Sequence, residues 1–347
     1  MESTDEHQAL AVEELAIKAN SPPTNYIVKD SESIISTTLP ILEIPTIDTS
    51  LLSSSSFEAA GELRRLRTAL RSCGYFQAIN HGMSASFLDE VLEVTGKFFK
   101  LPLDEKRTYS RDENGIDGYG NDVIYSDRQT LDWNDRLYLH VLPESIRKCE
   151  KWPRLPQNFR EILLEFTERL RVMNEIIVKA MEKSLDLGEN CFLDQFGKNP
   201  ISLTRFNFYP PCPWPDRILA VKPHGDASGT TYLLQDKEVE GLQVLKDDHW
   251  YRVPLTPDAI VFNCGDQLEI MTNGIFKSPI HRVVTNKEKE RRTVALFFSP
   301  ELTSEIKPAE GLIDDKHPKL YKSVIDYTRN YFEHLQNGRR PIDALKI

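Results

Sequence analysis

From residue 200 onward the sequence breaks into short strand-like runs, and this pattern limits the possible folds more than any other feature. Runs rich in β-branched and aromatic residues alternate with Gly, Pro, Asp and Asn, as in LTRFNFYP (203–210), TTYLLQ (230–235), HWYRVPL (249–255) and TVALFF (293–298). Several short strands at regular spacing, separated by turn residues, are typical of all-β sandwiches and barrels. The pattern therefore predicts a β-sandwich or a jelly-roll barrel in the second half of the chain.

The first half of the chain is predicted to be mostly helical. Between Pro156 and Gly188 the apolar residues recur with a period near 3.6, which predicts one long helix with Gly188 just after its end. Two strands are expected earlier, at 41–48 and 74–80, and a helix is expected to close the chain over 318–336.

Composition indicates a cytoplasmic protein without a nucleic-acid partner. The 347 residues carry a formal net charge of −10, so no basic excess is available to neutralise a nucleic-acid backbone. The five cysteines are scattered without a CxxC pair, which suggests free thiols in a reducing compartment. The acidic start lacks the apolar stretch of a signal peptide, and no apolar run approaches the roughly 20 residues of a membrane span. We expect a monomer with a small-molecule substrate and no nucleic-acid or membrane partner.

His224, Asp226 and His281 are the candidate metal ligands. In an extended chain, residues i and i+2 point to the same side, so His224 and Asp226 of KPHGD converge. His281 lies within the apolar run SPIHRVV, 55 residues after Asp226. Two neutral imidazoles and one carboxylate form the facial triad that holds Fe(II) and leaves other positions open for substrate and O2. The His-x-Asp motif alone is weak, and an aspartate turn after a strand is its structural alternative.

Arg291 and Thr293 are the candidate anion-binding residues. Along RRTVALFF, strand parity places Arg291, Thr293 and Phe297 on one face. A guanidinium inside a barrel is costly unless an anion pairs with it, and Thr293 offers a hydroxyl to the same anion. Asn207 and Tyr209 share a face of their own run, and Tyr209 can donate a further hydrogen bond. Together with a metal, these groups suit a small dicarboxylate that chelates iron with one end.

The ordered set of motifs resembles that of plant 2-oxoglutarate/Fe(II)-dependent dioxygenases. The matching segments are GYFQAINHG (74–82), LPLDEK (101–106), NFYPPCP (207–213), HGD (224–226), EGLQV (240–244), NCGDQLEIMTNG (263–274), SPIHRVVTN (278–286) and RRT (291–293). The resemblance implies that the two histidines and Asp226 form the catalytic iron site. It implies that Arg291, Thr293 and Tyr209 bind 2-oxoglutarate, with Asn207 in the same cofactor site. Thr293 stands where the family usually has Ser, which keeps the hydroxyl.

The resemblance also implies a fold, namely an α+β chain with a double-stranded β-helix (jelly-roll) core flanked by helices. On this basis we expect four regions in the chain. They are an N-terminal arm and linker (1–40), a mostly helical dioxygenase region (41–195), the jelly-roll catalytic core that binds Fe(II) and 2-oxoglutarate (196–305), and a C-terminal helical segment (306–347).

A chain that resembles this family is expected to oxidise a small, largely apolar metabolite. Decarboxylation of 2-oxoglutarate to succinate and CO2 would be coupled to hydroxylation or O-demethylation of a flavonoid-like or alkaloid-like molecule. The implied cofactors are Fe(II), 2-oxoglutarate and O2, with ascorbate as reductant. Tyr125, Leu139 and Phe297 are candidate substrate-pocket residues, with ordinary packing as the alternative for each. The glycine-rich segment DGYGND (117–122) is either a mobile pocket wall or a plain loop.

Two other functions stay open from the sequence. An oxidase on the same scaffold that needs no 2-oxoglutarate would keep Arg291 and Thr293, and succinate release on turnover separates it from a 2-oxoglutarate enzyme. A catalytically silent barrel that captures a small molecule would not need the three metal-binding side chains, which are all present here.

Overall fold

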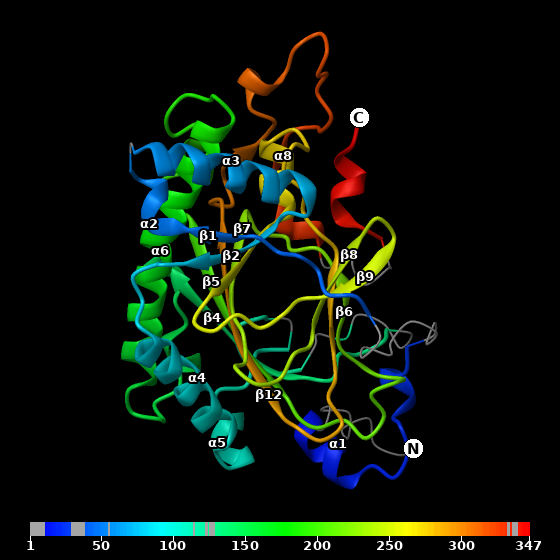
Figure 1. Cartoon of the computed structure of the whole chain (residues 1–347). Coiled ribbons are helices and arrows are strands. Elements are labelled where there is room, and N and C mark those ends of the chain that lie inside the picture. Colours follow the sequence, from blue (N-terminus) through cyan, green and yellow to red (C-terminus); the bar gives the residue numbers. More distant parts are fainter. Residues whose placement is uncertain are drawn as a thin grey trace.

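Two facing β-sheets form the centre of the computed structural model, which describes residues 11–28, 39–54, 56–113, 115–121, 124, 129–331, 334 and 339–347 (Figure 1). The larger sheet has the strand order β1-β2-β10-β7-β12-β5-β4-β3 and the smaller sheet the order β6-β11-β8-β9. The larger sheet comprises β1 (Thr46–Asp48), β2 (Tyr75–Ile79), β3 (Gly118–Gly120), β4 (Asp135–Leu142), β5 (Ile201–Tyr209), β7 (Thr230–Leu234), β10 (Ile260–Cys264) and β12 (Arg291–Ser299). The smaller sheet comprises β6 (Leu219–His224), β8 (Leu242–Lys246), β9 (His249–Arg252) and β11 (His281–Val284).

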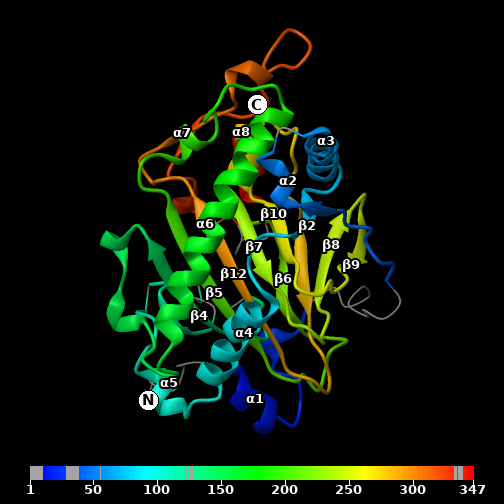
Figure 2. The same cartoon turned by 60° about the vertical axis from the view of Figure 1, so that its left-hand side comes forward.

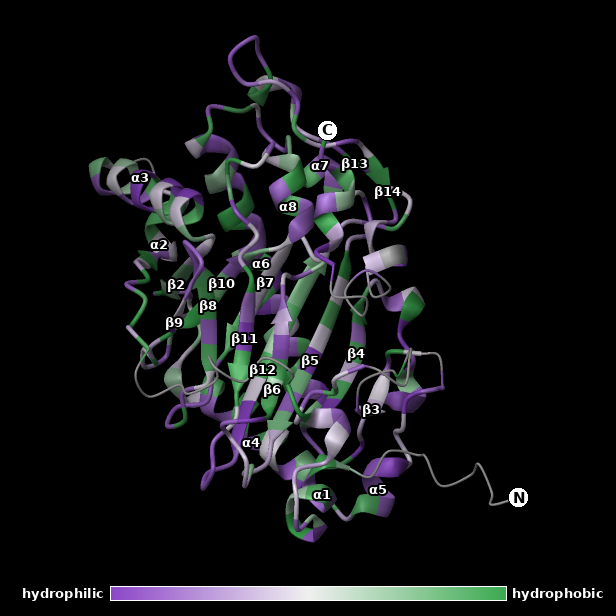
Figure 3. Cartoon of the chain, turned by 90° about the vertical axis from the view of Figure 1, so that its right-hand side faces the viewer, coloured by the Kyte–Doolittle hydropathy of each residue, from purple (hydrophilic) through white to green (hydrophobic). Residues whose placement is uncertain are grey.

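The two faces of the large sheet have different surroundings. Along β12, Val294, Leu296 and Phe298 belong to a hydrophobic core shared with the helices, whereas Arg291 and Thr293 line a cavity between the sheets. Bands of hydrophobic and hydrophilic residues alternate along the strands in Figure 3. Because side chains in a strand alternate between its two faces, one face can be fully apolar while the other carries polar groups. The space between the sheets is therefore available for a functional site.

Helices cover the outer face of the large sheet. α6 (Phe159–Ser184) runs along it, with α3 (Phe57–Ser72) and α4 (Ala85–Phe99) packed beside it (Figures 1 and 2). The other α-helices of the described residues are short: α1 (Val12–Lys18), α2 (Thr49–Leu52), α5 (Leu103–Arg107), α7 (Leu193–Phe196) and α8 (Asp266–Met271). In the described part of the chain, no helix has both the length and the apolar composition needed to cross a membrane.

The long helix predicted between Pro156 and Gly188 forms as α6, but it stops earlier than expected. Its last residue is Ser184, and Leu185 is the C-cap. Asp186 follows with a φ of 56°, the left-handed conformation that often ends a helix. The helix-ending position that the sequence assigned to Gly188 is therefore occupied by an aspartate.

The prediction of a C-terminal helix over 318–336 is wrong for residues 318–330. This stretch contains a short strand, β14 (Val324–Ile325), which pairs with β13 (Glu305–Ile306), and then a 3₁₀ turn at Tyr327–Asn330. Asp326 has a φ of 52°, which a continuous right-handed helix does not allow. The segment is held instead by side-chain hydrogen bonds to buried groups, described below.

The prediction of the two early strands is accurate for the second strand and too long for the first. β2 lies within the predicted 74–80, whereas only Thr46–Asp48 of the predicted 41–48 forms a regular strand. Ile41 makes a single isolated bridge to Arg252. The strand starts directly after Pro45, whose ring carries no backbone N–H for a sheet ladder.

Residues 11–28 pack against the barrel through a buried carboxylate. Asp135, at the start of β4, accepts hydrogen bonds from the backbone N–H groups of Val12 (2.9 Å) and Glu13 (3.1 Å), in the first turn of α1. An aromatic edge contact between Tyr26 and Trp133, with ring centroids 5.4 Å apart, adds to the packing. Burial raises the pKa of Asp135 to about 6.

The raised pKa of Asp135 predicts a measurable pH dependence of stability. Its folded-state pKa lies above the unfolded value of about 3.9, so the folded protein binds the extra proton and gains stability as the pH falls. We expect the unfolding free energy of wild type minus that of Asp135→Asn to rise by about 1.4 kcal/mol for each unit by which the pH falls from about 6 to about 4. Urea unfolding across this range measures it. A difference that does not vary with pH would contradict the prediction, and Asp104→Asn, at an exposed position, is the control.

Candidate active site

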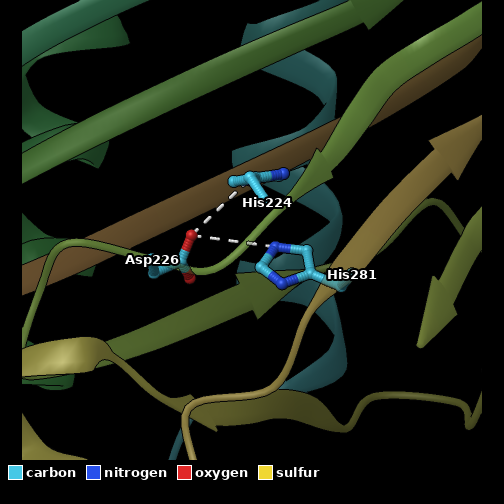
Figure 4. A group of neighbouring side chains, drawn as sticks. All are labelled: His224, Asp226 and His281. Atoms are coloured by element: carbon cyan, nitrogen blue, oxygen red, sulfur yellow. Dashed lines mark ion pairs between the residues drawn. The ribbon is translucent and has the colours of Figure 1, made fainter. Parts of the chain in front are cut away.

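Strand pairing brings the three predicted metal ligands together. His224 ends β6 and His281 begins β11, and these two residues are direct partners in the antiparallel pair. Asp226 lies in the turn just after β6. Its Oδ1 is 3.6 Å from His224 Nε2 and 3.7 Å from His281 Nε2, and the imidazole centroids are 4.2 Å apart (Figure 4). One ligand atom from each residue lies within 4.8 Å of the others, a spacing that a single metal ion can bridge.

Both imidazoles are held with Nε2 directed at the centre of the group. His224 Nδ1 lies 2.9 Å from the carbonyl oxygen of Lys222, and His281 Nδ1 lies 3.3 Å from that of Pro279. A carbonyl oxygen only accepts, so Nδ1 carries the proton and Nε2 presents its lone pair. Burial, together with the neighbouring His281, lowers the pKa of His224 to about 3. His224 is therefore neutral near pH 7, as a metal ligand must be.

The carboxylate of Asp226 is oriented by two buried donors. Thr231 Oγ1 (2.6 Å) and Asn263 Nδ2 (2.9 Å) both donate to Oδ2, which leaves Oδ1 facing the histidines. Burial raises the pKa of Asp226, but the two histidines and these hydrogen bonds outweigh it and hold the pKa below its usual value. The site therefore presents one ionised oxygen beside two imidazole nitrogens, a donor set suited to a borderline divalent ion.

Arg291 is a buried cation with an unsatisfied donor. Only 2 % of the residue is exposed, and its Nε donates to the carbonyl oxygen of Val239 (3.0 Å) and its Nη2 to Gln235 Oε1 (3.4 Å). Nη1 is buried and has no hydrogen-bond partner among the described residues. Tyr209 is the cross-strand neighbour of Arg291, and its ring lies 5.2 Å from the guanidinium. The unpaired Nη1 donor of Arg291 is therefore suited to bind an anion.

Thr293 and Asn207 face the same interior. They are cross-strand partners on β12 and β5, and Asn207 Nδ2 donates to Thr293 Oγ1 (3.1 Å). Because the threonine oxygen accepts this bond, its own proton can be donated to a third group. The parity prediction for Arg291, Thr293, Asn207 and Tyr209 thus agrees with where their side chains lie.

Two cavities meet at the triad. A narrow cavity of about 50 Å³ contains all three candidate metal ligands and all four candidate anion-binding residues in its wall. A wider cavity of about 340 Å³ lies on the other side of His224 and Asp226. Their shared wall consists of Arg205, Val221, His224, Asp226 and Phe297. A small molecule in the wide cavity would therefore approach a metal held by the triad.

The three candidate substrate residues have different positions. Phe297 lines both cavities, at their junction. Leu139 is wrongly assigned, because it is fully buried in the core on the helix-facing side of β4. Its neighbours Tyr138 and His140 point the other way and line the wide cavity. Tyr125 lies outside the described residues.

The described part of the glycine-rich segment 117–122 is neither a plain loop nor a free flap. Gly118–Gly120 forms β3 and pairs with β4. Asp117 accepts from the backbone N–H of His140 (2.8 Å), and its second carboxylate oxygen lies 2.7 Å from His140 Nδ1. These bonds tie the segment to β4 beside His140, which lines the wide cavity.

The sequence reasoning missed the C-terminal part of the pocket wall. Tyr327 and Tyr331 both line the wide cavity. The Tyr327 hydroxyl donates to Asp266 Oδ2 (2.7 Å), and the Tyr331 hydroxyl donates to the carbonyl oxygen of Gly225, between the two ligands of the His-x-Asp motif. No signal in the sequence indicated this role, because Tyr327 and Tyr331 fall within the predicted helix. Strand parity could have identified Arg205, which lies two residues before Asn207 on β5 and therefore shares its face.

Comparison with known proteins agrees with this geometry. Residues 200–300 match the 2OG-Fe(II) oxygenase superfamily, and residues 44–155 match the non-haem dioxygenase in morphine synthesis N-terminal family. Codeine O-demethylase from Papaver somniferum is 39 % identical over 307 residues, which cover 88 % of this chain and 85 % of that protein. The chain belongs to the 2-oxoglutarate/Fe(II)-dependent dioxygenase family. This confirms the resemblance drawn from the motifs, and the protein is a 2-oxoglutarate-dependent dioxygenase.

Two further relatives of this dioxygenase extend the similarity. Oxoglutarate-dependent flavonoid 7-O-demethylase 1 from Ocimum basilicum is 37 % identical over 340 residues, covering 97 % of this chain and 90 % of that protein. A crystal structure of JOX2 in complex with 2OG, Fe and JA superimposes with a TM-score of 0.87 at 33 % identity, covering 97 % of this chain and 98 % of that one. The superposition confirms the predicted jelly-roll core flanked by helices.

Removing the Thr231 hydroxyl should weaken metal binding by this dioxygenase. Thr231→Val keeps nearly the same volume but deletes one of the two hydrogen bonds that orient Asp226. We expect the dissociation constant for Mn²⁺, used to avoid iron oxidation, to rise about tenfold, as is usual when the partner of a metal ligand is lost. Equilibrium dialysis of the metal measures it.

Thr230→Val is the matched control for this experiment. Thr230 is as deeply buried as Thr231, but it donates to Asn174 on α6 (2.7 Å), on the opposite side of the sheet. Equal Mn²⁺ affinities in wild type and Thr231→Val, or an equal loss in Thr230→Val, would show that the hydroxyl does not orient the carboxylate.

Proposed function

We propose that this dioxygenase hydroxylates or O-demethylates a small, largely apolar metabolite of the flavonoid or alkaloid kind. The observation that carries the proposal is the meeting of two cavities at His224, Asp226 and Phe297. The narrow cavity leads to a buried guanidinium, which suits a dicarboxylate, and the wide cavity of about 340 Å³ has room for a small organic molecule. The similarity to codeine O-demethylase and to the flavonoid 7-O-demethylase supports the substrate class.

The residues present fit a ferrous ion. His224 Nε2, Asp226 Oδ1 and His281 Nε2 would ligate it, since each Nδ1 faces a backbone carbonyl oxygen and Oδ1 is the carboxylate oxygen that Thr231 and Asn263 leave open. A single negative ligand leaves part of the ferrous charge uncompensated, and three protein ligands leave positions open for a chelating co-substrate and O2.

The far carboxylate of 2-oxoglutarate would bind at the other end of the narrow cavity. Arg291 Nη1 is the unsatisfied cationic donor, and the Thr293 hydroxyl has a proton to give because it already accepts from Asn207. Tyr209, paired with Arg291 across the strands, would donate a third hydrogen bond. Charge-assisted bonds of this kind hold a carboxylate in one orientation, so the oxalyl end would reach the metal.

The chain's own contribution to catalysis would be positioning and exclusion of water. When bound, iron and 2-oxoglutarate supply the oxidising chemistry with O2, and succinate and CO2 are the by-products. Apolar residues of both sheets, including Leu242, Val283 and Leu233, line the narrow cavity, and Phe297 lies in the wall that it shares with the wide one. A substrate C–H bond held against this junction would face the metal. Oxidation of an O-methyl carbon would release formaldehyde and a free hydroxyl group.

We also propose that the enzyme works as a monomer in the cytoplasm, with ascorbate as the reductant that keeps the iron ferrous. All five cysteines are free thiols, which supports a reducing compartment. The formal net charge of −10 supports a small-molecule substrate rather than a nucleic acid.

Replacing Arg291 with glutamine should raise the 2-oxoglutarate requirement. The change removes a charge-assisted bond to the far carboxylate, so we expect the KM for 2-oxoglutarate to rise roughly 10- to 100-fold. Arg292→Gln is the matched control because Arg292 lies on the same strand but contacts Gly96 of α4 on the outer side. The measurement is succinate formation against 2-oxoglutarate concentration. An unchanged KM in Arg291→Gln would remove this residue from the co-substrate site.

A metabolite panel should identify the substrate class. We expect methylated or unsubstituted flavonoids or alkaloids to stimulate succinate and CO2 release, with formaldehyde formed in equal amount when an O-methyl group is attacked. Asp226→Ala should abolish release because the metal loses its only anionic protein ligand. Substrate turnover without succinate would favour the 2-oxoglutarate-independent oxidase instead.

A further inference from the structure

Tyr75 enters the narrow cavity at the level of the metal ligands. On β2 it lies directly opposite Asn263 of β10, which in turn lies opposite Thr231 of β7. Residues opposite one another in antiparallel strands point to the same face. Asn263 and Thr231 both donate to Asp226 Oδ2, so the whole row faces the triad.

The ring of Tyr75 also contacts one of the candidate ligands. It stands edge-on to the imidazole of His281, with centroids 6.3 Å apart and an interplanar angle of 88°. Tyr75 is in the wall of the narrow cavity but not in that of the wide one. Its side chain therefore approaches the triad from the co-substrate side rather than from the substrate side.

The hydroxyl of Tyr75 is buried without a partner. The residue is 1 % exposed, and its oxygen forms no hydrogen bond with any described residue. Tyr232 and Tyr321 are buried tyrosines that do bond their hydroxyls, to Asn174 (3.0 Å) and Glu269 (2.6 Å), whereas Tyr119, which does not line the narrow cavity, also has a hydroxyl unpaired within the described part of the chain. A buried hydroxyl left unpaired is costly, which indicates that this one has a partner when the site is in use.

The hydroxyl of Tyr75 is a donor at any physiological pH. A tyrosine hydroxyl loses its proton only at about pH 10. A hydroxyl that keeps its proton can donate a hydrogen bond to an anion. Beside a triad that binds a cation, such an anion would be a negatively charged ligand of the metal.

Arg291 lies at the opposite end of the narrow cavity. Phe297 is the cross-strand partner of Thr231, and Arg291 lies six residues before Phe297, at the start of β12. A bound dicarboxylate that reaches from the triad to Arg291 therefore offers its far end to Arg291 and its metal-binding end to the row that contains Tyr75.

We propose that the Tyr75 hydroxyl donates a hydrogen bond to the 2-oxo-carboxylate end of the co-substrate, next to the metal. This inference rests on the proposed use of the narrow cavity for 2-oxoglutarate. It assigns recognition of the two ends to separate groups, Tyr75 for the metal-binding end and Arg291 for the far carboxylate. Tyr75 thus recognises any 2-oxo acid, whereas Arg291 recognises only one with a second carboxylate.

Two probes separate the two ends. 2-Oxoglutarate carries both carboxylates, and 2-oxopentanoate has the same 2-oxo acid end without the far carboxylate. Calorimetric titration of each probe into the Mn²⁺-loaded full-length protein gives dissociation constants without turnover. We expect Tyr75→Phe to weaken both probes by the same factor, roughly tenfold, as loss of a hydrogen bond to a charged group does. We expect Arg291→Gln to weaken 2-oxoglutarate alone.

Tyr232→Phe is the matched control, since it removes an equally buried hydroxyl that bonds to Asn174 on α6. Unchanged affinity for both probes in Tyr75→Phe would overturn the inference, as would a loss confined to 2-oxoglutarate or an equal loss in Tyr232→Phe. If Arg291→Gln still lowers the affinity for 2-oxoglutarate in those cases, the proposed function stands and only the role of Tyr75 is lost. Tyr75→Met, which lacks the hydroxyl but has a different shape, must reproduce the loss, and thermal unfolding confirms that each variant is folded.

Discussion

The active site depends on the antiparallel pairing of β6 with β11. This pairing sets His281 directly opposite His224, and the turn after β6 returns the Asp226 carboxylate to the same point. A register slip of one residue would turn His281 to the other face of the sheet and leave two ligands instead of three. The register of this pair shifts between His281 and Val283 and again between Val283 and Val284.

The division of the large sheet into two faces makes a polar interior possible. Its outer face packs apolar side chains against α4 and α6, and that packing holds the strands in place. The inner face can then carry polar groups that mostly satisfy one another, as Thr231 and Asn263 do for Asp226. Two of the hydrogen-bond donors left unsatisfied there, Arg291 Nη1 and the Tyr75 hydroxyl, belong to residues that line the narrow cavity. They are where a bound anion finds its donors.

Sequence periodicity predicted the site better where only one face of a strand is apolar. On β12 and β5, polar residues at alternate positions identified the inner face, and Phe297, grouped with Arg291 by parity, lines the cavities on that face. On β4 both faces carry large side chains, so periodicity could not tell Leu139 in the core from Tyr138 and His140 in the pocket wall. The C-terminal segment has a helical pattern, but hydrogen bonds from its tyrosines to buried acceptors outweigh that local preference.

By itself the sequence determined which residue types are available for metal and anion binding, the jelly-roll family, and the strand parity that groups Arg291 with Thr293. Those properties are local or depend on the order of motifs along the chain. Only the tertiary structure decided that Tyr75 and Asn263 stand beside Asp226, that Tyr331 bonds to the carbonyl between the two His-x-Asp ligands, and that Leu139 belongs to the core. These neighbours lie far apart in the chain, and strand register and packing bring them together.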